Sequence, residues 1–306
     1  MKSTILKKYN WAVFFMAMLG VVFLILFNYI PMFGIVIAFK DMDGVINITK
    51  ALAEKPFVGF KNFISFMNDR KFLDIISNTI GMNVFQLVFS FPAPIIFALL
   101  LNEVQHLWVK KTVQTITYFP YFISWVVFGG VVISMLSPDN GIINVVLQNL
   151  GIIKEPVSFM ANPDYFWSIV TISGIIKGIG WSAVIYLAAI AGIDLALYEA
   201  ATIDGANRFQ RMLYITLPGI LSTVVILLLL SISNLLNSSF DQIYMLQNQL
   251  NLSRSEVIDT YVYKIGISEM RYSFTTAVGV FKSAIAFILL WGSNMLSKRY
   301  LGRGIY

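Results

Sequence analysis

The sequence predicts an all-α membrane protein with six membrane-spanning helices, and two observations support this. First, 58% of the 306 residues are hydrophobic and only 12% are charged, whereas a soluble domain carries about a quarter charged residues. Second, the apolar residues gather into runs of about 20, the length that an α-helix needs to cross the hydrocarbon core of a bilayer. No linker or low-complexity tract interrupts the chain, so residues 1–306 are expected to form one transmembrane domain.

The first expected span begins at Trp11 and stops before Pro31. Prolines at positions 92 and 94 should kink the second span, which neighbouring helices make tolerable by satisfying the freed carbonyls. The six spans are expected at about 11–30, 80–101, 113–136, 168–191, 219–240 and 275–296.

The first apolar run follows Lys2, Lys7 and Lys8, as the core of a cleaved signal peptide would. The run is longer than an ordinary signal-peptide core, however, and no A-x-A cleavage pattern appears before Pro31. We therefore expect a retained span.

Charge predicts the orientation. The N-terminus, the loops at 102–112 and 192–218 and the C-terminus together hold ten cations and four acids. The other side holds ten cations and twelve acids, so Lys and Arg are tied and the orientation rests on the short loops and span ends, where cytoplasmic positive charge is the rule. Both termini and the 192–218 loop are thus expected in the cytoplasm. The ten cations are Lys2, Lys7, Lys8, Lys110, Lys111, Arg208, Arg211, Lys298, Arg299 and Arg303.

Two segments between the spans carry local signals. Apolar residues recur near helical spacing over 58–76, which indicates an amphipathic helix on the membrane or on a partner. SPDNGIIN at 137–144 predicts a turn followed by a short helix or re-entrant piece.

The composition argues against an enzyme. Cysteine is absent, which excludes disulfides, cysteine metal sites and thiol chemistry. A single histidine, His106, and scattered carboxylates offer neither a metal-ligand cluster nor a nucleophilic triad. The chain also lacks a G-x-x-x-x-G-K-[ST] phosphate loop, so we expect it neither to hydrolyse ATP nor to hold a cofactor. The net charge of +6 follows from the topology and implies no nucleic-acid partner.

A polar segment, EAATIDGANRFQRMLYITLPGI, spans 199–220 in this otherwise apolar chain. Its small residues let another surface approach the backbone closely, and flanking charges would fix the register of that surface. Gly205 suits a break between two short helices, and Pro218 suits the first turn of the next helix. We therefore expect a helix-turn-helix presented to the cytoplasm; the alternative is an ordinary amphipathic loop that caps the bundle.

The motif itself favours the first interpretation. EAA is followed after three residues by Gly205, and after nine more by Ile215-x-Leu217-Pro218. This pattern resembles the EAA loop of the permeases of binding-protein-dependent ABC importers. FPAPIIFALLLNEV, TYFPYFISWVVFGG, YLAAIAGID and VIDTYVYKIG resemble the branch that imports oligosaccharides or polysaccharide fragments.

The resemblance implies a type I (MetI-like) importer in a bacterial cytoplasmic membrane. It implies a second permease subunit, usually different, two cytoplasmic ATPases that use ATP and Mg, and an extracytoplasmic sugar-binding protein. Each ATPase would receive one EAA loop in a surface cleft. The coupling role carried over by the motif falls on Glu199, Ala200, Ala201, Asp204, Gly205, Ala206 and Pro218.

Polar residues inside the spans are candidates for the substrate path, because such residues usually face a bundle interior or a water-filled cavity. Asn234, Asn237, Ser238 and Asp241 are spaced to share one helix face, as are Asn83, Gln86 and Ser90, and Ser173, Lys177 and Trp181. Amides can bind sugar hydroxyls and aromatic rings can cover apolar sugar faces. The alternative for each is an interhelical hydrogen bond. The candidates are Lys177, Trp181, Asn234, Asn237, Asn83, Gln86 and Lys282.

The two lysines within spans need partners, and few acids lie at that depth. Either they reach the membrane interface or they face the path, which the position of Lys177 favours. A cationic path would favour acidic oligosaccharides. The run from Gly174 to Gly178 is interpreted as close helix packing.

Together these features predict one half of the pore of an ATP-driven carbohydrate importer that works by alternating access. A secondary transporter driven by an ion gradient is the alternative, but it would show inverted repeats and paired intramembrane acids. Asp241 is the only acid near a span core. A membrane scaffold would not need polar faces on several spans.

Overall fold

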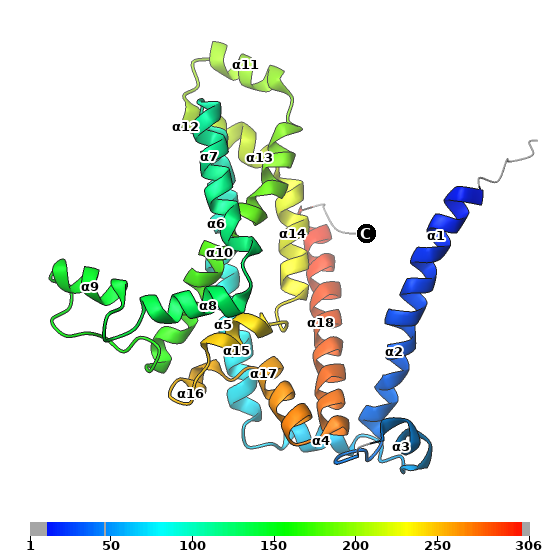
Figure 1. Cartoon of the computed structure of the whole chain (residues 1–306). Coiled ribbons are helices and arrows are strands. Elements are labelled where there is room, and N and C mark those ends of the chain that lie inside the picture. The colour runs from blue at the N-terminus through cyan, green and yellow to red at the C-terminus, as the bar shows by residue number, and fades with distance from the viewer. Residues whose placement is uncertain (1–10, 46, 302–306) are drawn as a thin grey trace, which may run out of the picture. The chain divides into compact units, whose positions relative to one another are not determined.

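The structure of the protein, a computed structural model, describes residues 11–45 and 47–301 (Figure 1). Within these residues every named element is a helix, which confirms the predicted fold class. Lys2, Lys7, Lys8 and Arg303, and with them the expectation for both termini, lie outside the described residues. The chain forms two compact units: residues up to Asp69 together with Val262–Phe281, and Arg70–Tyr261 together with residues from Lys282 on.

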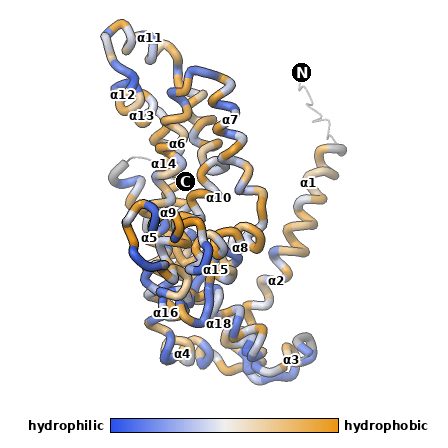
Figure 2. Tube along the Cα trace, turned by 60° about the vertical axis from the view of Figure 1, so that its left-hand side comes forward, coloured by the Kyte–Doolittle hydropathy of each residue, from blue (hydrophilic) through white to orange (hydrophobic). Residues whose placement is uncertain are grey.

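The first unit begins with a helix that continues past Pro31, contrary to the expectation that the span stops there. Pro31 has no N–H to donate to the preceding turn. Around it the helix changes from α to π geometry, returns to α for three residues and continues as a 3-10 helix, so the hydrogen-bond pattern shifts at the proline. Val13–Phe39 is long and apolar enough to span a membrane, and Figure 2 shows its apolar character. The elements of this helix are α1 (Trp11–Leu24), η1 (Ile25–Tyr29), α2 (Ile30–Met32) and η2 (Phe33–Phe39).

The rest of the first unit packs around Phe66, whose ring meets those of Phe274 and Phe281 edge to face. Asp43 accepts a hydrogen bond from the backbone N–H of Ser273 (2.9 Å), in the first turn of the last helix. The elements are α3 (Ile48–Glu54), α4 (Lys61–Met67), η6 (Lys264–Ser268) and the start of α18 (Tyr272–Leu301). The segment 58–76 is thus not one helix, because α4 ends at Met67 and the next helix begins at Phe72.

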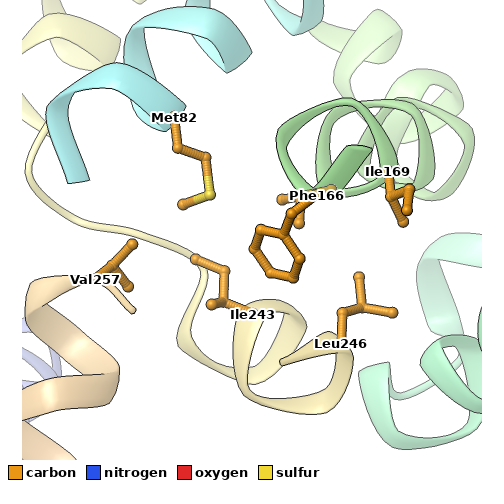
Figure 3. Packing of buried hydrophobic residues seen from close by; sticks show 7 residues of the cluster. Met82, Phe166, Ile169, Ile243, Leu246 and Val257 are labelled. Atoms are coloured by element: carbon orange, nitrogen blue, oxygen red, sulfur yellow. The ribbon is translucent and has the colours of Figure 1, made fainter. Parts of the chain in front are cut away.

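In the second unit, the long helix α10 (Phe166–Ala191) is central. Met82, Phe166 and Ile243 belong to one buried cluster against it (Figure 3), and Ile95, Ala183 and others form a second cluster. Around α10 lie α5 (Phe72–Ser90), α6 (Pro92–Asn102), α7 (Leu107–Tyr118) and α15 (Phe240–Leu246).

The span predicted at 113–136 is broken, and the span predicted at 219–240 starts at a bend. Leu107–Phe122 and Trp125–Met135 meet at 104°, and Arg208–Gly219 and Leu221–Ser233 meet at 60°. The described residues hold four helices long enough to cross a membrane, or up to six if each bent pair is one span. The remaining elements are η3 (Phe119–Phe122), α8 (Trp125–Met135), α9 (Ile142–Asn149), η4 (Pro163–Tyr165), α11 (Leu195–Ile203), α12 (Arg208–Arg211), η5 (Met212–Thr216), α13 (Leu217–Gly219), α14 (Leu221–Ser233), α16 (Leu252–Ser255) and α17 (Ile258–Tyr263).

Candidate functional site

The EAA segment folds as two helical arms joined by a tight turn at Gly205. The first arm is α11, and the second runs from α12 through η5 to α13. The N–H of Gly205 donates to the carbonyl of Thr202 (3.1 Å), and the N–H of Ala206 donates to that of Ala201 (2.9 Å). This pair of bonds is a Schellman motif, which needs a left-handed residue at its turn. Gly205 supplies it with φ of +80°. The expected break at Gly205 is therefore present.

The second arm begins at once. The side chain of Asn207 accepts from the N–H of Gln210 (2.9 Å), while the side chain of Gln210 accepts from the N–H of Asn207 (2.8 Å). This reciprocal capping box satisfies two amides at the start of α12. The hydroxyl groups of Tyr198 and Thr216 lie 2.9 Å apart and tie the two arms together.

No residue of α11 is buried, although the helix carries apolar side chains. Leu195 is 73% exposed and Ile203 is 87% exposed. Figure 1 shows α11 and α12 at the opposite end of the second unit from α16. Such an exposed apolar face beside the charge of Glu199 is typical of a surface that a partner covers.

All seven predicted coupling residues lie in these arms. Ala201 and Ala206 are half-buried, and Glu199, Ala200, Asp204, Gly205 and Pro218 are exposed. Sequence reasoning missed Gly219, whose side-chain position would fall 2.7 Å from Cδ1 of Ile193. The Pro-Gly pair was the available signal for this close approach.

An open cavity of about 520 Å³ lies within the second unit. Five of the seven path candidates line it, and the described residues around it include no Asp, Glu, Lys, Arg or His. The polar and aromatic lining comes from Asn83, Gln86, Ser90, Phe91, Trp181, Ser182, Tyr186, Ser231, Asn234 and Asn237. Sequence reasoning missed Ser231, which precedes Asn234 by three residues, and Ser182, which follows Trp181.

The cavity wall is partly preorganised. The amide of Asn83 donates to the hydroxyl of Ser238 (2.9 Å), and that of Asn237 donates to the side chain of Asn234 (2.9 Å). The ring of Trp181 stacks on that of Tyr121 with centroids 4.7 Å apart. The amides thus combine internal hydrogen bonds with exposure to the cavity.

The predicted polar face of the fifth span is corrected by the structure. Helix α14 ends at Ser233, so Asn234, Asn237 and Ser238 lie in a break, and Asp241 lies in the next helix, α15. The side-chain amide of Asn234 donates to the carbonyl of Leu230 (3.0 Å), the kind of local bond with which asparagine competes against a helix.

Lys177, which we expected to face the substrate path, does not line this cavity. Its side chain is buried, and its ammonium donates to the carbonyls of Pro120 (3.0 Å), Tyr121 (2.8 Å) and Ile123 (2.6 Å). These carbonyls lie at the bend between α7 and α8, where helical bonding is interrupted. Backbone carbonyls are therefore the partners of this cation. The hypothesis of a cationic path rested on a lysine without a partner in the span, so Lys177 no longer supports it.

Lys282 does not line the cavity either. It forms an ion pair with Asp259 near the start of α17. The two side chains are 14% and 22% exposed. Asp259 lies outside the six spans expected from the sequence, so this partner was missed.

Of the run Gly174–Gly178, expected to pack closely, Gly174 lies against Gln242, where a side chain would fall 3.4 Å from Nε2; the closer approach is at Gly180. A side chain at Gly178 would meet nothing within 4 Å, whereas one at Gly180 would fall 2.4 Å from the carbonyl oxygen of Thr117. Gly180 therefore sets the contact of α10 with α7.

Comparison with known proteins now places the chain. Residues 65–302 match the model of the family described as binding-protein-dependent transport system inner membrane component. The chain belongs to this family. It is accordingly the permease subunit of an ABC importer, and the alternative of an ion-driven secondary transporter is excluded.

Relatives and solved structures agree with this family. Protein LplB of Bacillus subtilis strain 168 is 39% identical over 98% of this chain and 92% of its own length. The polygalacturonan/rhamnogalacturonan transport system permease protein YteP of the same strain is 40% identical over 96% of this chain and 89% of its own.

A bacterial ABC transporter involved in the import of the acidic polysaccharide alginate has a chain of the same fold. Its TM-score is 0.85 at 35% identity, over 95% of this chain and 96% of that one. A structure of a bacterial alginate transporter in complex with an alginate pentasaccharide-bound periplasmic protein gives a TM-score of 0.86 at 34% identity, over 97% and 98% of the two chains.

Proposed function

We propose that this permease forms one half of a translocation pore for an oligosaccharide, and that the cavity lined by Asn83, Gln86, Trp181, Asn234 and Asn237 is part of the path. The observation that carries the proposal is the uncharged lining of amides, hydroxyls and an indole ring. Amides and hydroxyls both donate and accept hydrogen bonds, as sugar hydroxyls do. The relatives named for polygalacturonan and alginate transport support the same class of substrate.

The path residues can be tested at Gln86, which lines the cavity on α5. Gln86→Leu should raise the KM for oligosaccharide uptake while expression and assembly stay normal, because the change removes only a polar group facing the path. Val88→Leu, on the exposed side of the same helix, is the matched control and should leave KM unchanged. An unaltered KM in Gln86→Leu would remove this residue from the path.

The proposed role of Glu199, Ala200, Ala201, Asp204, Gly205, Ala206 and Pro218 is docking to a cytoplasmic ATPase. The exposed apolar face of α11 supports this role, since it presents Leu195 and Ile203 to a partner. The left-handed turn at Gly205 would hold α11 at a fixed angle to the second arm.

The proposed assembly contains a second homologous permease, an ATPase dimer that uses ATP and Mg, and an extracytoplasmic sugar-binding protein. We propose that this chain has no enzymatic activity and no cofactor of its own. The cytoplasmic placement of both termini and of the 192–218 loop is part of the same proposal. The ten cations against four acids that these segments hold together with the 102–112 loop support it.

Co-purification tests the assembly. The tagged chain, purified from its native cells, should carry a second permease and an ATPase, identified by mass spectrometry together with any bound sugar. Glu199→Ala should retain the second permease and lose much of the ATPase, because only the docking surface changes. Glu155→Ala removes an exposed carboxylate outside the loop and should retain both partners. Full ATPase recovery and normal transport in Glu199→Ala would exclude the assigned role of this residue.

A further inference from the structure

The break between α14 and α15 depends on a charge from another helix. The backbone N–H of Ser238, within this break, donates to Oδ2 of Asp259 (2.9 Å). Ser238 is half-buried and lies outside the helices, so its N–H has no partner from a helical ladder and needs one elsewhere. Asp259 supplies that partner.

Asp259 is itself held in place. Its helix, α17, is anchored to α5, because the N–H of Ile258 donates to the hydroxyl of Thr79 (2.9 Å). The side-chain amide of Asn78 on α5 also donates to the carbonyl of Glu256 (3.2 Å). The carboxylate of Asp259 is therefore a fixed point for the break.

The charge of Asp259 is balanced by Lys282 on α18, which contacts the other carboxylate oxygen, Oδ1. Because both side chains are largely buried, loss of one partner leaves an uncompensated charge that seeks solvent. The carboxylate would then move away from Ser238.

The same break reaches the cavity. The hydroxyl of Ser238 accepts from Asn83, which lines the cavity, and Asn234 and Asn237 line it from the break itself. A continuous set of polar contacts thus runs from Lys282 through Asp259 and Ser238 to Asn83.

We propose that the Asp259–Lys282 ion pair positions the 234–239 break in the cavity wall, so that both residues act as positioning residues for transport although neither lines the cavity. This inference rests on the proposed function, in which the cavity is part of the sugar path. Its chemistry is simple: the carboxylate holds the amide of Ser238, and the ammonium keeps the carboxylate in place.

Absence of cysteine from the chain allows a direct test. Ser182→Cys on α10 and Asn237→Cys in the break place two thiols in the cavity lining. A short bifunctional thiol reagent should link them in membranes of expressing cells, with the yield quantified by peptide mass spectrometry. Lys282→Met should lower this yield by about tenfold, because loss of one partner of a buried ion pair shifts an equilibrium by at least a decade.

The control pair is Ser182→Cys with Gln86→Cys, which joins α10 to α5 without involving the break. Its yield should be the same with Lys282 and with methionine in its place. Asp259→Asn alone should lower the Ser182–Asn237 yield, since the ammonium is left unpaired. Asp259→Asn combined with Lys282→Met should restore it to within about twofold, because asparagine still accepts from Ser238 and no charge remains.

An unchanged Ser182–Asn237 yield in Lys282→Met would overturn the proposal, and so would equal losses at both thiol pairs, which indicate general unfolding. Lys282→Arg keeps the charge and should retain the yield. The crosslinks are measured without sugar, so failure of the proposed transport function would appear in uptake assays and leave this result untouched.

Discussion

Replacing Lys177 with methionine should destabilise the protein without changing which sugars it carries. The substitution removes both the charge and its three backbone hydrogen bonds. The carbonyl of Pro120 keeps a second donor, the N–H of Ile123 (3.3 Å). The carbonyls of Tyr121 and Ile123 are therefore the two acceptors counted as losing their partner. At about 1–3 kcal/mol for each buried acceptor left unsatisfied, the expected loss is about 2–6 kcal/mol.

The assay is heat treatment of the detergent-purified protein, followed by measurement of the fraction that stays monodisperse. One kcal/mol corresponds to about 2–4 °C for domains somewhat smaller than this chain, so the midpoint should fall by about 4 °C or more. Because membrane proteins often unfold irreversibly, all variants need the same heating rate. Ile176→Met, an exposed neighbour on the same helix, is the control and should leave the midpoint nearly unchanged.

If Lys177→Met kept the midpoint of the unaltered protein and instead changed the preference between neutral and acidic oligosaccharides, Lys177 would face the path. The carbonyl contacts at the α7–α8 bend would then not explain why a lysine lies there.

Three further predictions follow from the geometry. Gly180→Ala should cost about 1–3 kcal/mol by overpacking against Thr117, measured as the same heating midpoint, whereas Gly178→Ala, with open space, should be tolerated. Trp181→Ala should raise the KM for uptake by up to about tenfold through loss of aromatic contact, and a change confined to kcat would contradict a binding role. Gly205→Ala should weaken ATPase co-purification more than Gly205→Asn, because a left-handed residue costs about 1–2 kcal/mol with a Cβ and asparagine tolerates it best; equal recovery would contradict the role of the turn.

The features that the sequence predicted well are local. Asn83 and Gln86 share a face because both lie on one uninterrupted helix, α5, and both line the cavity. Gly205 lies at the break because a Schellman turn is decided by a few consecutive residues. Such features need only helical spacing and turn chemistry.

The features that the sequence did not predict depend on partners distant in the chain. Lys177 is bonded to carbonyls more than 50 residues away, exposed by a 104° bend that apolar composition alone does not reveal. Lys282 is paired with Asp259, which lies outside the apolar runs. The end of α14 at Ser233 was also missed, because asparagine next to an apolar run gives no clear signal for a helix end.

The two lysines within the spans share one physical cause. A helix broken at membrane depth leaves carbonyls without partners at the end of its first part and amides without partners at the start of the next. At the α7–α8 bend a cation, Lys177, bonds the carbonyls directly. At the α14–α15 break a carboxylate, Asp259, bonds the amide of Ser238, and Lys282 balances its charge. In this permease, charged residues within or beside the spans therefore stabilise breaks in the helices, and the uncharged side chains that those breaks place in the cavity are left to meet the substrate.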